Sequence, residues 1–157
     1  MNEFRVERMH HNRKDHFADL FNQYNFYLDE TSREKPALKR ISERWFDSEP
    51  VLFMALRSYA ESIPVGFIRL SMYSSANTVT TTIINDLYVL PDYRYNGIAL
   101  KLIEAAVKFA INNKSALIQL ETLQDNFVAQ KLFESVGFKS QTSDAEWNVY
   151  YIRFEFD

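Results

Sequence analysis

The fold of this chain is decided by the stretch Leu87-Tyr88-Val89-Leu90-Pro91-Asp92-Tyr93-Arg94-Tyr95-Asn96-Gly97-Ile98-Ala99-Leu100. It predicts the end of a strand, a turn, and a helix that begins at about Gly97. The first N–H groups of a helix lack an intrahelical acceptor and carry partial positive charge, so this turn suits an anion such as phosphate. Gly97 permits close approach to the backbone, and Arg94 can add a full charge. The alternative is an ordinary strand-to-helix turn with an exposed arginine.

The turn differs from the two common nucleotide-binding motifs. It contains no GxxxxGK[ST] sequence, so it is not a P-loop. Its single glycine cannot satisfy the GxGxxG pattern of a dinucleotide site. The whole chain has only three glycines, Gly66, Gly97 and Gly137, so each is expected where no other residue fits.

On both sides of the turn, some segments have apolar residues at every second position, as strands do, and others have them at every third or fourth position, as helices do. The C-terminal half predicts a strand, helix, strand, helix and strand, with Asp125 as a cap of the second helix and Gly137 just after its end. A right-handed crossover places strands 78–89 and 116–122 in parallel. The N-terminal half predicts a strand at 4–9, two helices within 15–45, and an antiparallel meander through strands 51–56, 65–70 and 78–89. We therefore expect an α/β (α+β) fold with one mixed central sheet.

Composition narrows the class of protein. The 157 residues predict a single domain over 1–157, and the net charge of −3 argues against nucleic acid as a partner. Without cysteine there is no disulfide, cysteine-ligated zinc or cysteine nucleophile, and we expect no metal. No apolar run is long enough to span a membrane, and the charged N-terminus does not resemble a secretory signal. We expect a cytoplasmic protein.

Two blocks of sequence resemble the GNAT superfamily of acetyl-CoA-dependent N-acetyltransferases. The first is Val89-x-Pro91-x-x-Arg94-x-x-Gly97-x-Ala99, which is similar to the acetyl-CoA-binding signature of that family. The second begins at Glu121-Thr122 and continues as Asn126-x-x-Ala129-x-x-Leu132-Phe133-Glu134-x-x-Gly137-Phe138. The resemblance implies a mixed sheet of six or seven strands with about four helices, splayed where the cofactor enters.

The resemblance also implies how acetyl-CoA is held. Its pyrophosphate is expected on the N–H groups of the turn formed by Arg94, Tyr95, Asn96, Gly97, Ile98 and Ala99. Its pantetheine arm is expected along the strand edge, on backbone groups of Leu87 and Val89, with Asn126 as a further contact. One of these N–H groups can polarise the thioester carbonyl. From the residues alone, Asn126 is equally well explained as the first residue of a helix.

The expected reaction is direct attack of an amine on the thioester in a ternary complex. An alkyl amine is mostly protonated at neutral pH, so a proton must leave first, often through water to a carboxylate. Asp86 and Glu121 are the candidate bases, although either can instead bind a cationic substrate or be a structural acid.

The chain departs from the family at three positions. Phe133 stands where many members carry the tyrosine that protonates the leaving thiolate, and Tyr150 is the candidate replacement. Asn85 stands where some members place a glutamate. Tyr95 replaces a frequent glycine of the turn, which is tolerable if its φ stays negative.

The acceptor is expected to be a small-molecule amine, such as an amino acid, a polyamine or an aminoglycoside-like compound. Tyr24, Tyr27 and Asn85 are its expected contacts, because aromatic faces and nearby acids suit a cation; Tyr24 can equally be a core residue. The alternatives are acetylation of a protein lysine or N-terminus, and a non-catalytic sensor of coenzyme A. The large aromatic content also suggests a homodimer.

Overall fold

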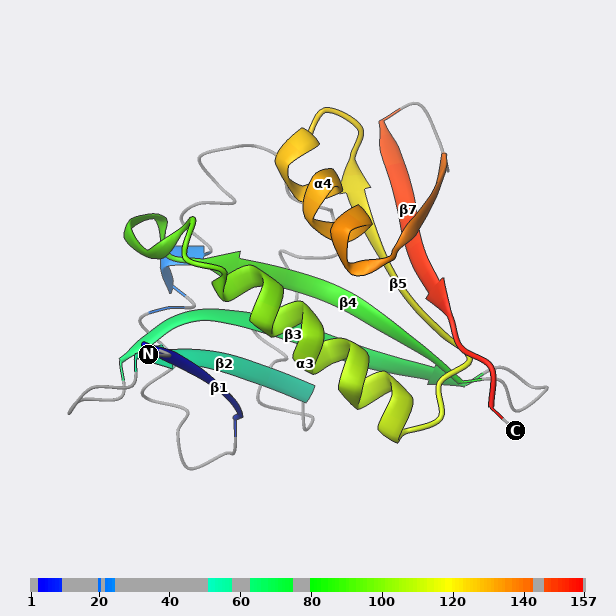
Figure 1. The fold of residues 1–157 in the computed structure, drawn as a ribbon, viewed down its shortest axis with the longest axis horizontal. Helices are drawn as coiled ribbons and strands as arrows, with labels where there is room; N and C mark the ends of the chain where they lie inside the picture. The colour runs from blue at the N-terminus through cyan, green and yellow to red at the C-terminus, as the bar shows by residue number, and fades with distance from the viewer. Residues whose placement is uncertain are drawn as a thin grey trace. The chain divides into compact units, whose positions relative to one another are not determined.

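The computed structural model describes residues 3–9, 20, 22–24, 51–57, 63–74, 80–142 and 146–156. These residues contain a seven-stranded sheet with the strand order β1-β2-β3-β4-β5-β7-β6 (Figure 1). The chain divides into two compact units, residues 1–69 with 87–102 and residues 70–86 with 103–157, and each is described by itself. Among the described residues, no helix is both long and apolar enough to cross a membrane.

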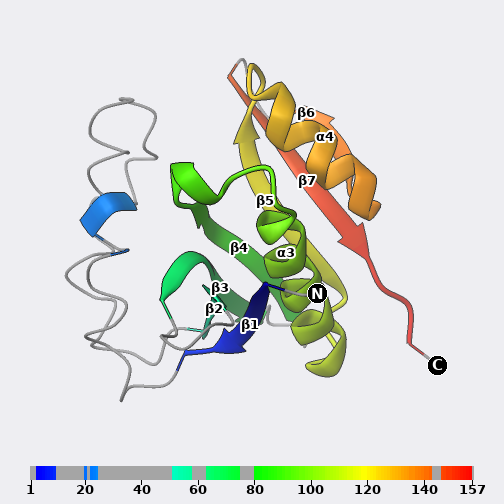
Figure 2. The same cartoon turned by 60° about the vertical axis from the view of Figure 1, so that its left-hand side comes forward.

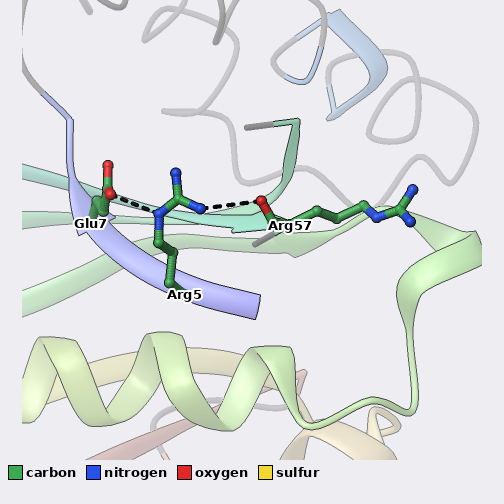
Figure 3. A network of polar contacts seen from close by, with 3 residues as sticks. All are labelled: Arg5, Glu7 and Arg57. Atoms are coloured by element: carbon green, nitrogen blue, oxygen red, sulfur yellow. Dashed lines mark hydrogen bonds and ion pairs between the residues drawn. The ribbon is translucent and has the colours of Figure 1, made fainter. Parts of the chain in front are cut away.

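The first unit begins with the antiparallel strands β1 (Phe4–Arg8) and β2 (Val51–Arg57). Their polar contacts lie at the partly exposed edge strand β1. Arg5 donates from Nε to a Glu7 carboxylate oxygen over 2.8 Å and from a terminal nitrogen to the Arg57 carbonyl over 3.2 Å (Figure 3).

The core of the first unit is built around three aromatic rings. Tyr24 packs edge-on against Phe67 at 5.1 Å and lies 5.2 Å from the ring of Tyr88. Phe67 lies on β3 (Pro64–Ser74) and Tyr88 on β4 (Thr80–Val89), so the cluster joins the two strands that lead into the turn. Burial of aromatic rings at these separations stabilises both strands and fixes the end of β4.

Gly66 allows β3 and β4 to approach closely just before the turn. A Cβ atom at this position would lie 2.8 Å from the Tyr88 carbonyl oxygen and 3.3 Å from a Val89 methyl group. The Leu90 N–H donates to the Val65 carbonyl over 2.9 Å at the same place. The expectation that this scarce residue stands where no other fits is confirmed.

The second unit contains β4 up to Asp86, β5 (Leu117–Leu123), β6 (Lys139–Thr142) and β7 (Trp147–Arg153). β4 and β5 are parallel, as predicted, and β7 is antiparallel to both β5 and β6. Helix α4 (Phe127–Val136) lies along the β5, β7 and β6 strands (Figure 2). Its Phe133 ring lies 5.8 Å from the Tyr150 ring of β7, so Tyr150 is on the face of the sheet that α4 covers.

Helix α3 (Ile98–Asn112) completes the β4-α3-β5 crossover. It buries residues at three- and four-residue steps, among them Leu102, Ala106 and Ala110. After the helix, the hydroxyl of Ser115 lies 2.6 Å from that of Thr82, and both side chains are fully buried. This hydrogen bond ties the start of β5 to β4 within the second unit.

The predicted mixed sheet, meander and crossover are confirmed, and two local predictions are corrected. The strand β6 is not predicted from the sequence, because the short segment Lys-Ser-Gln-Thr has no apolar alternation. The predicted cap of α4 is Asp125, but the structure has Asn126 there, whose Oδ1 accepts the Ala129 N–H over 3.3 Å. Gly137 ends the helix with φ +110°, as expected for a left-handed C-terminal residue.

Candidate active site

The strand-to-helix turn is held in place by Arg94. A short 3-10 helix, η3 (Pro91–Tyr93), leads from β4 into it. Arg94 then reaches back: its Nε donates to the Val89 carbonyl over 3.0 Å, and its guanidinium carbon lies 5.7 Å from the centre of the Tyr88 ring. The charge expected at the anion site is therefore anchored to the end of β4, where it still raises the local positive potential.

The next three residues form a concave backbone loop. Tyr95 and Gly97 both adopt left-handed conformations, with φ +65° and +76°. Between them, the Asn96 side-chain amide donates to the carbonyls of Tyr93 and Arg94 over 3.0 and 3.1 Å. Left-handed residues at alternate positions are compatible with an anion-binding nest, in which successive N–H groups point toward a common centre.

The condition under which Tyr95 would be tolerable, a negative φ, is not met. Its left-handed φ explains why a glycine is frequent at this position of the family, because an L-residue is strained there. The ring of Tyr95 is 97% exposed, so packing of its side chain does not account for this conformation. The hydrogen bonds of Asn96 hold the loop instead.

The nest leaves backbone donors for a ligand. The first bond of α3 runs from the Lys101 N–H to the Gly97 carbonyl, so the N–H groups of its first turn, from Ile98 to Leu100, have no acceptor one helical turn earlier within the helix. A Cβ atom at Gly97 would meet nothing within 4 Å, so the approach to the loop is open. Ile98 is buried and fixes the start of the helix. The loop can therefore bind a diphosphate through main-chain donors.

An open strand edge lies in the second unit. The register between β4 and β5 covers three pairs, from Thr81 opposite Leu117 to Ile83 opposite Gln119. Within the second unit, β4 continues beyond this register to Asp86 and β5 continues to Leu123. Backbone groups after the last pair are therefore able to bind an extended ligand as an added strand would.

The predicted pantetheine contacts are divided between the two units, with Leu87 and Val89 in the first and Asn126 in the second. Leu87 and Val89 are on the continuation of β4, although the Val89 carbonyl already accepts a hydrogen bond from Arg94. Asn126 is exposed after β5 and uses its side-chain oxygen to cap α4. Its contact with pantetheine stays a prediction.

The predicted acids occupy two different environments. Asp86 is only 3% exposed on β4, beyond the last β4–β5 pair, whereas Glu121 is exposed on β5 opposite Val149. Between β3 and β4, Asn85 donates from Nδ2 to the Ser71 hydroxyl over 2.9 Å. Asn85 thus makes a cross-strand contact, and its expected contact with substrate stays a prediction.

Tyr150 is buried among aromatic rings behind β7. Its hydroxyl lies 3.4 Å from a Glu134 carboxylate oxygen, with the ring of Phe133 alongside. Burial and then the negative charge of Glu134 raise the pKa of Tyr150 above its ordinary value. The hydroxyl therefore stays protonated at neutral pH and is able to act as a donor.

The predicted acceptor contacts are only partly described. Tyr24 is 7% exposed in the aromatic core, which agrees with the alternative reading of it as a core residue. Tyr27 lies outside the described residues. Among the described residues, no group of three or more histidines, aspartates and glutamates is placed to hold a metal ion.

The comparisons with known proteins show the family to which the chain belongs. The sequence matches the Acetyltransferase (GNAT) family over residues 14–138. It is 32% identical to the uncharacterized N-acetyltransferase YhfO of Bacillus subtilis (strain 168), over 80% of this chain and 83% of that protein. It is 30% identical to thialysine N-epsilon-acetyltransferase of Mus musculus, over 60% of this chain and 54% of that protein.

The fold is similar to that of solved acetyltransferase structures. A chain in the crystal structure of the NatC complex bound to Gag peptide and CoA matches with a TM-score of 0.75 at 21% identity, over 98% of this chain and 99% of that one. At 21% sequence identity, this match shows only that the two folds are similar.

Proposed function

Because this chain belongs to the GNAT family of N-acetyltransferases, we propose that it transfers an acetyl group from acetyl-CoA to the primary amine of a small molecule. The observation that carries the proposal is the loop at Tyr95–Gly97, with two left-handed residues directly before the first turn of α3, which suits a diphosphate. The diphosphate of acetyl-CoA is an anion that such main-chain donors can bind.

The other residues of the site are given roles by position. Leu87 and Val89 offer backbone groups to the pantetheine arm, and Asn126 adds a polar contact. When bound, acetyl-CoA supplies the thioester, whose carbonyl carbon is attacked by the amine nitrogen while the carbon–sulfur bond breaks. A main-chain N–H of β4 stabilises the negative charge that builds on the carbonyl oxygen. Since the chain has no cysteine, transfer is direct and needs no thioester on the protein.

Before attack, the ammonium of the substrate loses a proton to a carboxylate, either directly or through a water molecule, and the neutral amine that results is the nucleophile. Glu121 is the more accessible of the two candidates, because it is exposed whereas Asp86 is buried. Phe133 cannot protonate the leaving thiolate, and Tyr150 carries the hydroxyl next to its ring. A thiolate needs less proton assistance than an alkoxide, so activity survives the missing family tyrosine.

A small-molecule acceptor is supported by the relative from Mus musculus, whose name gives a single amino acid as its substrate. Tyr24, Tyr27 and Asn85 remain the proposed acceptor contacts. We further propose that the protein is cytoplasmic, forms a single domain over 1–157, and works without a metal; a homodimer is also proposed. These points rest on the sequence alone.

The proposal is tested by measuring thiol release from acetyl-CoA with a panel of amines. The panel contains free amino acids, diamines, an aminoglycoside, and peptides with a free N-terminus or an internal lysine. We expect turnover with at least one small amine and weaker turnover with every peptide. Preference for a peptide would instead favour a protein acceptor. Binding of acetyl-CoA without turnover on any amine, unchanged by Phe133→Tyr, would favour a coenzyme A sensor.

A further inference from the structure

The strands β5, β7 and β6 carry a second chemical feature, on the face away from α4. Tyr150 points toward α4, so its neighbours Val149 and Tyr151 lie on the opposite face, because side chains alternate along a strand. The register places Glu121 directly opposite Val149, and it places Lys139 opposite Tyr151. We call the face that carries Glu121, Tyr151, Lys139 and Arg153 the polar face.

The polar face separates negative from positive charge. Glu121 is exposed on β5, at the position opposite Val149 of β7. Arg153 ends β7, but its guanidinium folds back over the ring of Tyr151, 5.4 Å from the ring centre. Lys139 of β6 is opposite Tyr151 in the sheet. Positive charge therefore lies beside Tyr151. Along β7, Tyr151 is two residues from Val149, which is opposite Glu121.

The spacing of these charges matches a ligand with two charged ends. Two residues along a strand span about 7 Å. An extended ω-amino acid such as lysine separates its side-chain nitrogen from its carboxyl carbon by six single bonds of about 1.5 Å each in a zigzag, which is a similar length. A carboxylate pairs well with a guanidinium, and an ammonium pairs with a carboxylate.

The direction of such a ligand follows from the register. Tyr151 is opposite Gln119, which is part of the last β4–β5 pair. Glu121 lies two residues further, beside the open part of the β5 edge. A ligand with its carboxylate at Arg153 therefore presents its amine beside the part of β5 that lies beyond the last β4–β5 pair.

We propose that the acceptor is an amino acid with a side-chain amine, bound by Glu121 through its ammonium and by Arg153 through its carboxylate. The inference rests on the proposed acetyltransferase function and specifies its substrate class. It assigns substrate recognition to Arg153 and Tyr151, which lie outside both sequence blocks of the family resemblance. A diamine without a carboxylate uses only the Glu121 half of the site.

The test compares lysine with cadaverine, which is lysine without its carboxylate. The wild-type protein is expected to have a KM for lysine at least about tenfold below that for cadaverine, as a charge-assisted hydrogen bond is worth that much or more. Arg153→Met is expected to raise the KM for lysine and not to raise the KM for cadaverine, whose second ammonium gains nothing from a guanidinium. Arg153→Lys keeps the charge, and it is expected to retain most of the preference.

Two further measurements separate this inference from the proposed function. Lys131→Met removes an exposed cation from α4 and is the matched control, so its lysine KM is expected to stay at the wild-type value. Calorimetric binding of lysine to the CoA-loaded protein is expected to weaken in Arg153→Met to the same degree as KM. Equal use of both amines by the wild type, or an equal loss for both in Arg153→Met, would overturn the inference while the acetyl transfer stands. Failure to bind acetyl-CoA would overturn the proposed function itself.

Discussion

The diphosphate site at Gly97 is best tested by changing charge while keeping backbone strain constant. Any side chain at this position adopts the left-handed region at φ +76°, at a cost of about 1–2 kcal/mol in stability. No clash is added, because the space around a Cβ atom is open. Gly97→Glu and Gly97→Lys therefore share the strain and differ in the charge that they bring to the loop.

The expected change in affinity follows from the electrostatics of an exposed loop. A carboxylate about 6 Å from a phosphate oxygen is repelled by roughly 3 kcal/mol at an effective dielectric constant of about 20. The site is exposed to solvent and salt, so about 1–3 kcal/mol of this remains. The Kd for coenzyme A is therefore expected to rise between about fivefold and about 150-fold in Gly97→Glu. Gly97→Lys is expected to bind coenzyme A at least as tightly as the wild type does.

Isothermal titration of coenzyme A into each variant measures these values directly. Gly137→Glu is the matched control, because Gly137 is also exposed, left-handed and without neighbours around a Cβ atom, yet it lies at the end of α4 outside the loop. It is expected to lose stability without losing affinity. Equal weakening by the glutamate and lysine variants at position 97 would show that shape rather than charge governs the loop. No weakening by either would refute the assignment of the diphosphate.

Three further predictions concern strain, a buried hydrogen bond and a buried hydroxyl. Tyr95→Gly removes the left-handed strain of an exposed residue, so urea denaturation is expected to show a gain of up to about 1 kcal/mol in unfolding free energy; a loss would mean that the ring contributes to the fold. Ser115→Ala leaves the buried Thr82 hydroxyl without its partner and is expected to cost about 1–3 kcal/mol, part of which returns in the double variant with Thr82→Val. Burial and then Glu134 raise the pKa of Tyr150, so the unfolded chain loses this proton first and stability falls as pH rises through about 10. Tyr150→Phe is expected to flatten this alkaline loss in thermal denaturation, and an unchanged pH profile would contradict it.

The sequence predicts the elements around the turn well, because strong local signals coincide there. Pro91 and Gly97 bracket the connection, and the three- and four-residue spacing of apolar side chains defines α3. The same patterns do not predict β6, because a short edge strand with an exposed polar sequence has no regular spacing of apolar residues.

The site is predictable in composition but not in conformation. Its glycine and arginine are visible in the sequence, whereas nothing in the identity of Tyr95 indicates a left-handed backbone, because tyrosine rarely adopts one. The reach of Arg94 back to Val89 also depends on the tertiary position of a carbonyl group. The polar face arises from strand register and from the fold of Arg153 over Tyr151, which no local pattern encodes.

The most direct measurement of the central claim is an amide proton–nitrogen NMR titration with three ligands: coenzyme A, dephospho-coenzyme A and pantetheine. The first two contain the diphosphate, and the third does not. The N–H resonances from Tyr95 to Leu100 are expected to move downfield with both diphosphate ligands and to stay in place with pantetheine. Equal shifts with all three ligands, or shifts confined to other amides, would contradict binding of the diphosphate by this loop.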